Sequence, residues 1–424
     1  MSLFNLAWRK YNLKDNPYFQ EPLAISDSKI PMSAFIGRKN EILEIKKMIE
    51  LGEGRFFIIG DSGVGKTTLL NYVRSLARKG EFFSPENEIE INQPMSAQEF
   101  LLTTLNRLYQ EAKNKNLPLS GEISEILEKL FNLSSYSWDD NLPNKLNYET
   151  LKDIYFKTIK EIIYPKFKGI ILHYDNLDNI KEPELIEKMF GEMRDLLMKS
   201  SKVIFFFLGN KFLPEDIGYE PRTRQIFYFP PTDIPRLKFN DVKKILEERI
   251  KHLKKGNDLP VICPHTEGTL KILFELHNGN LRDTLKSLSA CVMELSKSNN
   301  PVVIDEILMH KLLTEKVEKD YLNGLTETER EILKKALDYG KSITPSELSK
   351  ITGKNFQNIS SKYIPKLMRK SALEFEGKEG RNVFYKVSSE IVWWKLSNKQ
   401  IKEEIKIKET EKEKEINKKL TDFI

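Results

Sequence analysis

The feature that most constrains this chain is a glycine-rich segment between a short apolar run and a helix-forming stretch. Residues 60–67 read Gly-Asp-Ser-Gly-Val-Gly-Lys-Thr and match the pattern G-x-x-x-x-G-K-[ST] at every fixed position. In such a loop, backbone N–H groups and a helix N-terminus surround a phosphate, and glycine is needed where the chain turns tightly. The segment therefore predicts a nucleoside-triphosphate site at the end of a strand.

Each side chain at the end of this loop has a predicted role. Lys66 is expected to reach the β- and γ-phosphates, and the Thr67 hydroxyl is expected to bind Mg²⁺. The predicted cofactors are ATP and Mg²⁺. The candidate nucleotide-binding residues are Gly60, Asp61, Ser62, Gly63, Val64, Gly65, Lys66, Thr67 and Thr68.

Short apolar runs alternate with longer helical stretches through residue 234, which predicts a doubly wound α/β domain. Continuous hydrophobicity in the later runs is typical of parallel strands buried on both faces. Some 75 helical residues separate the second and third runs, and the insertion at 93–168 has no assigned role. The predicted strands are Arg55–Ile59, Glu88–Ile91, Gly169–Tyr174, Lys202–Leu208 and Gln225–Phe229.

A second part of the site is predicted at the end of the third apolar run. Asp175 follows the run Gly169–Tyr174 and is the candidate carboxylate that holds Mg²⁺ from its other side. Many such ATPases place a glutamate next, where it polarises the attacking water. Here the residue is Asn176, whose amide orients water but cannot accept a proton, and Asp178 is a reserve base. This departure predicts slow hydrolysis.

The pattern becomes helical after Pro235 and changes again after residue 324. The stretches Thr326–Tyr339, Pro345–Thr352 and Asn355–Ser371 predict three helices, and Leu373–Glu376 with Asn382–Val387 predicts a hairpin. This is the order of a winged helix-turn-helix. The predicted domains are a lead-in at 1–34, an α/β domain at 35–234, a helical lid at 235–324, a winged domain at 325–396 and a charged tail at 397–424.

Charge is concentrated in the predicted winged domain. The whole chain has a net charge of only +6, which excludes a uniformly basic surface. Between Lys341 and Lys386 there are ten basic and four acidic residues, an excess of six. The candidate DNA-binding residues are Lys354, Gln357, Asn358, Ser361, Lys362, Lys378 and Arg381, of which Gln and Asn read base edges and Lys and Ser bind phosphates.

The third helix of this region is the candidate recognition helix. Its polar candidates are predicted to lie opposite an apolar face that includes Phe356, Ile359, Tyr363 and Leu367. Pro365 is predicted to kink or divide the helix near Ile364, which leaves base reading to its N-terminal half. The alternative is that the domain docks a protein and that its lysines are only solvated.

Several segments together resemble the archaeal AAA+ and STAND-type ATPases, including initiators related to the origin-recognition complex. They are Phe35-Ile36-Gly37-Arg38, the phosphate loop and the strand that ends at Asp175-Asn176. The resemblance implies a P-loop AAA+ sheet with a helical lid, and it extends over residues 35–394. It also implies a sensor role for Asn210, a second sensor role in the lid for Arg282, and an arginine finger at Arg222 or Arg224.

An arginine finger acting in trans implies a homo-oligomer, either a ring or a spiral. The leading hypothesis is an ATP-regulated protein that binds or remodels double-stranded DNA in replication initiation or mobile-element maintenance. A STAND-like signalling switch and a transposition-associated ATPase remain as alternatives. Two cysteines, no metal-ligand spacing, no long apolar run and no signal-peptide pattern favour a cytoplasmic protein without a structural zinc or a membrane segment.

Overall fold

The computed structural model describes residues 6–132, 147–163, 166–180, 182–213, 221–256, 260–298, 300–379 and 381–397, together with Thr410. The chain divides into two compact units. One unit is residues 22–235, and the other combines residues 1–21 with residues 236–424. Parts of the predicted insertion (133–146 and 164–165) and the tail at 398–409 and 411–424 lie outside the described residues.

The first unit is built on a parallel sheet in which β1, the strand before the phosphate loop, lies between β5 and the edge strand β6. Its order is β2-β4-β5-β1-β6, and β3 also pairs with β4. In the register, Ile59 of β1 is opposite Gly209 of β5, and Tyr174 of β4 is opposite Phe207 of β5. The carboxyl ends of β1, β5 and β4 therefore adjoin. The strands are β1 (Gly54–Ile59), β2 (Phe82–Phe83), β3 (Ile89–Glu90), β4 (Gly169–Asp175), β5 (Val203–Gly209) and β6 (Tyr228–Asp233).

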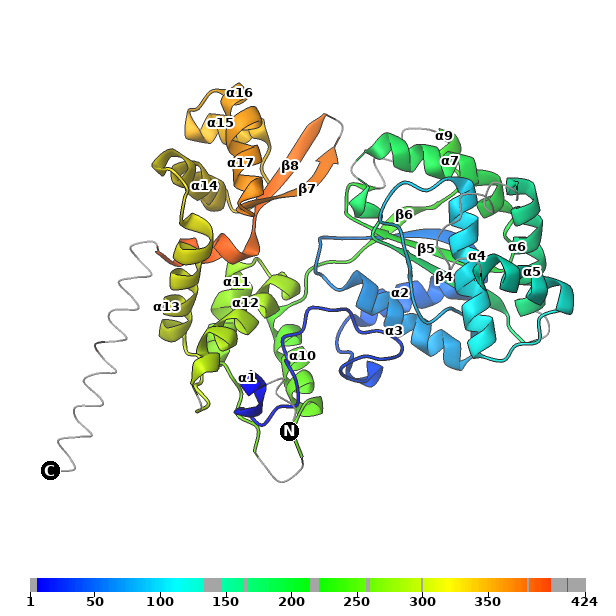
Figure 1. Cartoon of the computed structure of the whole chain (residues 1–424), viewed down its shortest axis with the longest axis horizontal. Coiled ribbons are helices and arrows are strands. Elements are labelled where there is room, and N and C mark those ends of the chain that lie inside the picture. Colours follow the sequence, from blue (N-terminus) through cyan, green and yellow to red (C-terminus); the bar gives the residue numbers. More distant parts are fainter. Residues whose placement is uncertain are drawn as a thin grey trace. The chain divides into compact units, whose positions relative to one another are not determined.

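Helices cover both faces of this sheet (Figure 1). Alternate residues of β1 point to opposite cores: Phe56 and Ile58 pack with α2 and α3, while Phe57 packs with the other helices. Each such buried side chain stabilises the fold by about 1.5–3 kcal/mol. This arrangement confirms the predicted doubly wound α/β fold. The helices are α2 (Lys39–Glu50), α3 (Lys66–Lys79), α4 (Ala97–Asn114), α5 (Gly121–Asn132), α6 (Tyr148–Ile163), α7 (Pro183–Lys199) and α9 (Pro221–Arg224), with short 3₁₀ turns at Met32–Ala34 and Leu177–Asn179.

Five of the six strands of this sheet were predicted, although not with every boundary. The last strand was predicted at Gln225–Phe229, whereas β6 spans Tyr228–Asp233 and contains Pro230 and Pro231. Proline is tolerated there because β6 is an edge strand, where a missing N–H costs no ladder bond. The two-residue strand β2 was not predicted because it is too short to give a periodic pattern.

The second unit begins with residues 1–21 of the predicted lead-in and continues with helices after residue 236. Arg249 holds the lead-in: its guanidinium lies 3.9 Å from the centre of the Phe19 ring and donates to the Phe19 carbonyl oxygen (2.7 Å). Tyr18 is fully buried, and its hydroxyl lies 2.6 Å from His265 Nδ1. The helices before residue 326 are α1 (Leu6–Arg9), α10 (Phe239–His252), α11 (Glu267–Leu276), α12 (Leu281–Glu294) and α13 (Glu306–Val317), followed by 3₁₀ and π turns at Leu295–Lys297 and Glu318–Leu322.

The end of this unit follows the predicted order of three helices and a hairpin. Thr326 and Thr344 begin α14 and α15 with reciprocal capping boxes, and Gly340 and Gly353 end them in the left-handed conformation. Ile343 adds an antiparallel bridge to Tyr385 on the hairpin. The elements are α14 (Glu327–Tyr339), α15 (Pro345–Thr352), α16 (Phe356–Asn358), a π turn η7 (Ile359–Tyr363), α17 (Ile364–Arg369), β7 (Leu373–Glu379), β8 (Asn382–Val387) and a 3₁₀ stretch η8 (Ser389–Ser397).

The third helix is interrupted where the proline predicted it. Pro365 has no N–H to donate to a carbonyl four residues earlier, and its ring needs space beside the preceding turn. The structure supplies that space with the π turn Ile359–Tyr363, after which α17 starts at Ile364. The predicted division near Ile364 is confirmed.

Two further observations bear on the sequence predictions. Both cysteines, Cys263 and Cys291, are free thiols. In the part of the chain that the structure describes, no helix has the length and apolar character needed to cross a bilayer.

Candidate functional site

The glycine-rich loop connects β1 to α3, at the carboxyl edge of the sheet and next to the end of β5. A Cβ at Gly60 would come within 2.7 Å of the Ile234 carbonyl oxygen, so a side chain at that position would displace the neighbouring backbone. Gly65 is the N-cap of α3 with φ of 93°, a conformation that L side chains rarely adopt. The fold thus depends on glycine at both ends of the turn, and the loop leads directly into a helix N-terminus that favours anions.

Lys66 lies against this loop with its side chain largely buried. Its ammonium donates to the carbonyl oxygens of Gly60 (2.9 Å) and Asp61 (3.2 Å). Lys211 Nζ, next to the end of β5, lies 3.6 Å from Asp61 Oδ1. Two lysine side chains therefore contact residues of the loop, and their positive charge favours the binding of polyphosphate.

The structure brings Thr67 and Asp175 together, although 108 residues separate them. The Thr67 hydroxyl donates to Asp175 Oδ2 at 2.6 Å, and the Asn176 N–H donates to Asp175 Oδ1 at 2.8 Å. Burial raises the pKa of Asp175, and these two hydrogen bonds partly offset that effect. Glu88, on the loop before β3, and Asp178 add negative charge that also raises it.

The donors at this point suit Mg²⁺, which typically takes one or two carboxylates and completes its shell with phosphates and water. A hydroxyl and a carboxylate meet beside the phosphate loop. Within the described residues, no cluster of three or more His, Cys, Asp or Glu is placed to hold a metal. One hydroxyl and one carboxylate leave the other positions of a Mg²⁺ shell to phosphate oxygens and water.

Asn176 and Asn210 both lie at the carboxyl edge of the sheet. Asn176 adopts the left-handed conformation with φ of 68°, which asparagine tolerates better than most residues. Asn210 follows β5, the strand between β1 and β4, so the topology places it between the phosphate loop and Asp175. Its Oδ1 accepts the backbone N–H groups of Phe212 (2.9 Å) and Leu213 (3.1 Å). The side chain thus also caps the turn after the strand.

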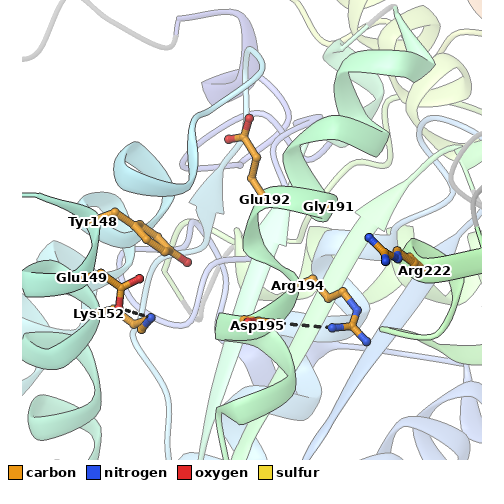
Figure 2. Close-up of a pocket in the computed structure, with 8 residues that line it drawn as sticks. All are labelled: Tyr148, Glu149, Lys152, Gly191, Glu192, Arg194, Asp195 and Arg222. Carbon is orange, nitrogen blue, oxygen red and sulfur yellow. Dashed lines mark hydrogen bonds and ion pairs between the residues drawn. The ribbon is translucent and has the colours of Figure 1, made fainter.

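Arg222 and Arg224 lie on the short helix α9 and are exposed. Arg222 lines a pocket of about 500 Å³ between α6, α7 and α9, shown in Figure 2. Arg194 from α7 points into the same region, near Arg222. Arg282 belongs to the first turn of α12 in the other unit, so its placement over the nucleotide stays a prediction.

Other residues at the loop were not assigned a role from the sequence. Arg38 has a left-handed backbone and donates to the Val64 carbonyl oxygen (2.8 Å) and to Glu41 (3.0 Å), which ties the entry of α2 to the phosphate loop. The Leu23 N–H donates to Thr68 Oγ1 at 3.2 Å, so this predicted nucleotide residue also anchors the chain before α2. Arg38 belongs to the segment Phe35-Ile36-Gly37-Arg38 quoted above. Its contact with Val64 could not be predicted from the sequence, because the two residues meet only in the folded loop.

The candidate DNA-binding residues lie in the third helix and the hairpin, except Lys354, which lies in the connection between α15 and α16. Gln357, Asn358, Ser361, Lys362 and Arg381 are exposed, while Lys354 and Lys378 are half-buried. Ile359, Ile364 and Leu367 are buried, as an apolar face requires. The prediction for Phe356 was wrong: its side chain is 54% exposed, because it lies in the first turn of the helix and beyond the hydrophobic core.

Comparison with known proteins gives one family match. Residues 33–163 match the family described as BREX system ATP-binding protein BrxC/D. This segment includes Arg38, the whole phosphate loop and α3. The match supports nucleotide binding at the loop. No curated protein sequence matches the chain.

Solved structures with a related arrangement include three archaeal proteins. The ORC2 protein of Aeropyrum pernix is 12% identical, with a TM-score of 0.46 over 94% of this chain and 99% of that chain. The Cdc6p protein of Pyrobaculum aerophilum is 14% identical, with a TM-score of 0.45 over 93% and 99%. The Aeropyrum pernix ORC1 protein in complex with DNA is 12% identical, with a TM-score of 0.43 over 85% and 93%.

Proposed function

We propose that this chain is an ATPase that binds Mg²⁺ and ATP at the phosphate loop and hydrolyses ATP slowly. The observation that carries the proposal is the 2.6 Å hydrogen bond between the Thr67 hydroxyl and Asp175 Oδ2. It joins the residue after the loop lysine to the end of β4, which is separated from β1 by β5. A hydroxyl and a carboxylate placed in this way are the two protein ligands that this chemistry requires. The description of the family matched by residues 33–163 supports ATP as the nucleotide.

The role proposed for each residue of the site follows from its position. Backbone N–H groups from Gly60 to Thr67 bind the phosphates, and the Lys66 ammonium exchanges its carbonyl contacts for phosphate oxygens. Thr67 and Asp175 hold Mg²⁺, which neutralises charge that develops on the transferred phosphoryl group. Asn176 orients water without removing its proton, and Asn210 lies at the same sheet edge as a contact for the terminal phosphate.

We further propose that bound ATP regulates attachment to double-stranded DNA. The exposed side chains of Gln357 and Asn358 can pair with adenine edges in the major groove, and Lys362 and Arg381 can bind phosphates. Arg222 and Arg224 are proposed to act on the nucleotide of a neighbouring copy, so that hydrolysis depends on assembly into a homo-oligomer.

The nucleotide site is tested with Lys66→Ala and a matched variant on the same helix. Lys79→Ala removes an exposed lysine from the last turn of α3. We expect Lys66→Ala to lower ATP affinity at least 100-fold, measured by anisotropy of a fluorescent ATP analogue, because it removes a buried charge that contacts two phosphates. Lys79→Ala should bind as the wild type does. Equal affinity of the Lys66 variant and the wild type would contradict the assignment of the loop.

A second candidate is favoured by the family match itself. The matched family belongs to a BREX system, so the chain can be proposed as the ATP-binding component of a multi-protein assembly whose C-terminal helices dock a protein. The exposed Phe356 and Ile351 fit such a contact. A gel shift on random duplex, with and without ATP, separates the two candidates, because a protein-docking module leaves the duplex unshifted.

A further inference from the structure

A buried arginine lies behind the candidate magnesium site. Arg74, on α3, has no exposed surface and is among the largest fully buried side chains. Its Nη1 donates to Asn71 Oδ1 (2.8 Å) and lies 2.9 Å from His173 Nδ1 on β4. The remaining donors reach three acceptors after β2, which are Ser84 Oγ (3.0 Å) and the carbonyl oxygens of Pro85 and Glu86.

These contacts determine the protonation of His173. A guanidinium only donates, so His173 Nδ1 must accept and carries no proton. The ring is therefore neutral, and its one proton is on Nε2. Arg74 itself keeps its charge at neutral pH, although burial lowers its pKa to about 10.

The nitrogen that carries this proton lies close to the candidate metal ligand, although beyond hydrogen-bond distance. His173 Nε2 lies 3.7 Å from Asp175 Oδ2, the oxygen that accepts the Thr67 hydroxyl. Nε2 is buried and has no hydrogen-bond partner among the residues that the structure describes. A buried donor without a partner is destabilising, and the strand position would otherwise suit an apolar side chain such as Ile171, two residues earlier.

We infer that His173 is a positioning residue for Asp175, held by Arg74 in the tautomer that directs an N–H at the metal-binding carboxylate. In this role Arg74 fixes the ring and the ring orients the carboxylate, so that Oδ2 stays turned toward Thr67. Carboxylates that bind metals commonly accept hydrogen bonds from neighbouring side chains. Loss of such a neighbour typically lowers metal affinity about 10- to 100-fold. The inference rests on the proposed function, because it assumes that Asp175 meets Mg²⁺ beside a nucleotide.

Two substitutions of His173 separate its two contacts. In His173→Asn the amide reaches the position of Nδ1, so it can satisfy Arg74 but cannot reach Asp175. In His173→Gln the amide nitrogen reaches the position of Nε2, so it can donate to Asp175 but leaves Arg74 one acceptor short. Ser84→Ala is the matched control, because it removes another acceptor of Arg74 and leaves the face toward Asp175 intact.

The readout is Mg²⁺ binding rather than turnover. Anisotropy of a fluorescent ATP analogue is measured in EDTA and then during a Mg²⁺ titration, and thermal melting is followed in parallel. We expect His173→Asn to weaken Mg²⁺ about tenfold while nucleotide affinity in EDTA is unchanged. His173→Gln and Ser84→Ala should keep the Mg²⁺ affinity of the wild type even where they melt at lower temperature.

The possible results distinguish this inference from the proposed function. Wild-type Mg²⁺ affinity in a folded His173→Asn variant overturns the inference alone. If that variant does not fold, His173→Gln decides, because a tenfold loss of Mg²⁺ affinity there contradicts a donor role and wild-type affinity supports it. A wild-type protein that binds no nucleotide with or without Mg²⁺ overturns the proposed function and this inference together.

Discussion

Asn176 follows the carboxylate that is expected to meet Mg²⁺, and its amide cannot accept a proton from water. A general base at such a point typically contributes a factor of about 10²–10⁴ to the rate. We therefore expect Asn176→Glu to raise the rate of ATP hydrolysis at least tenfold in a phosphate-release assay. Glutamate tolerates the left-handed backbone at this position less well than asparagine, so the variant should also melt at a slightly lower temperature.

Asn176→Gln is the control for that experiment. It has the length of glutamate and the same backbone strain, but it has no basic oxygen. Its rate should stay near that of the wild type, and its melting temperature should fall as in Asn176→Glu. A rate that stays unchanged in the glutamate variant, in a protein that still binds ATP, would contradict the position assigned to the attacking water.

Residues that are close in sequence were predictable, and residues that meet through the fold were not. The phosphate loop could be recognised because its phosphate ligands are consecutive and glycine has a steric role at fixed positions. Asp175 could be proposed because it ends a continuous apolar run. The contact between Arg74 and His173 spans 99 residues, and no local pattern marks it.

At the scale of elements, the connection between α11 and α12 depends on a neutral histidine. Ser287 Oγ donates to the Asp283 carbonyl oxygen (2.7 Å), so His277 Nε2, at 2.9 Å, must be the donor to Ser287 Oγ. Burial lowers the pKa of His277 to about 4. The unfolded chain, in which histidine titrates near 6.5, therefore binds more protons between pH 6.5 and about 4.

The free energy of unfolding should consequently fall as the pH falls through this range, by about 2–3 kcal/mol from His277. His277→Gln retains an N–H donor to Ser287 but has no group that titrates. Urea denaturation of both proteins at several pH values between 7.5 and 4.5 measures the effect. We expect a shallower pH dependence in the variant; an identical dependence would mean that His277 is not buried in its neutral form.

Helix and strand boundaries were predictable where a single local rule determines them. The predicted helices Thr326–Tyr339 and Pro345–Thr352 match α14 and α15 to within one residue, and Pro365 predicted the break in the third helix. The rule failed where tertiary position overrides local preference, as in β6, whose two prolines are tolerated only because the strand is at a sheet edge. Phe356 was misplaced for the same reason, since a helical face says nothing about where the core ends.

At the scale of the whole molecule, the proposed interface with DNA is tested through its charges. Lys362→Ala and Arg381→Ala should each weaken binding to any duplex sequence and reduce the dependence of affinity on salt by about one ion. Lys271→Ala, which removes an exposed lysine from α11, is the control and should leave both unchanged. Gln357→Ala should instead reduce discrimination between sequences, because its amide is proposed to contact base edges.

The proposed regulation of DNA binding by ATP predicts effects in both directions, because coupling between two binding sites is reciprocal. If ATP strengthens duplex binding by a given factor, duplex DNA must strengthen ATP binding by the same factor. We expect a factor of about 5–150, the usual range for coupled sites. Anisotropy of labelled DNA with and without ATP, and of a labelled ATP analogue with and without DNA, gives the two factors independently.

Lys66→Ala should remove the effect of ATP on DNA binding and leave the DNA affinity of the nucleotide-free protein unchanged. If ATP does not change the affinity for duplex DNA, the phosphate loop has no regulatory role in DNA binding. If the protein does not bind duplex DNA at low ionic strength, the result favours protein docking by the C-terminal helices.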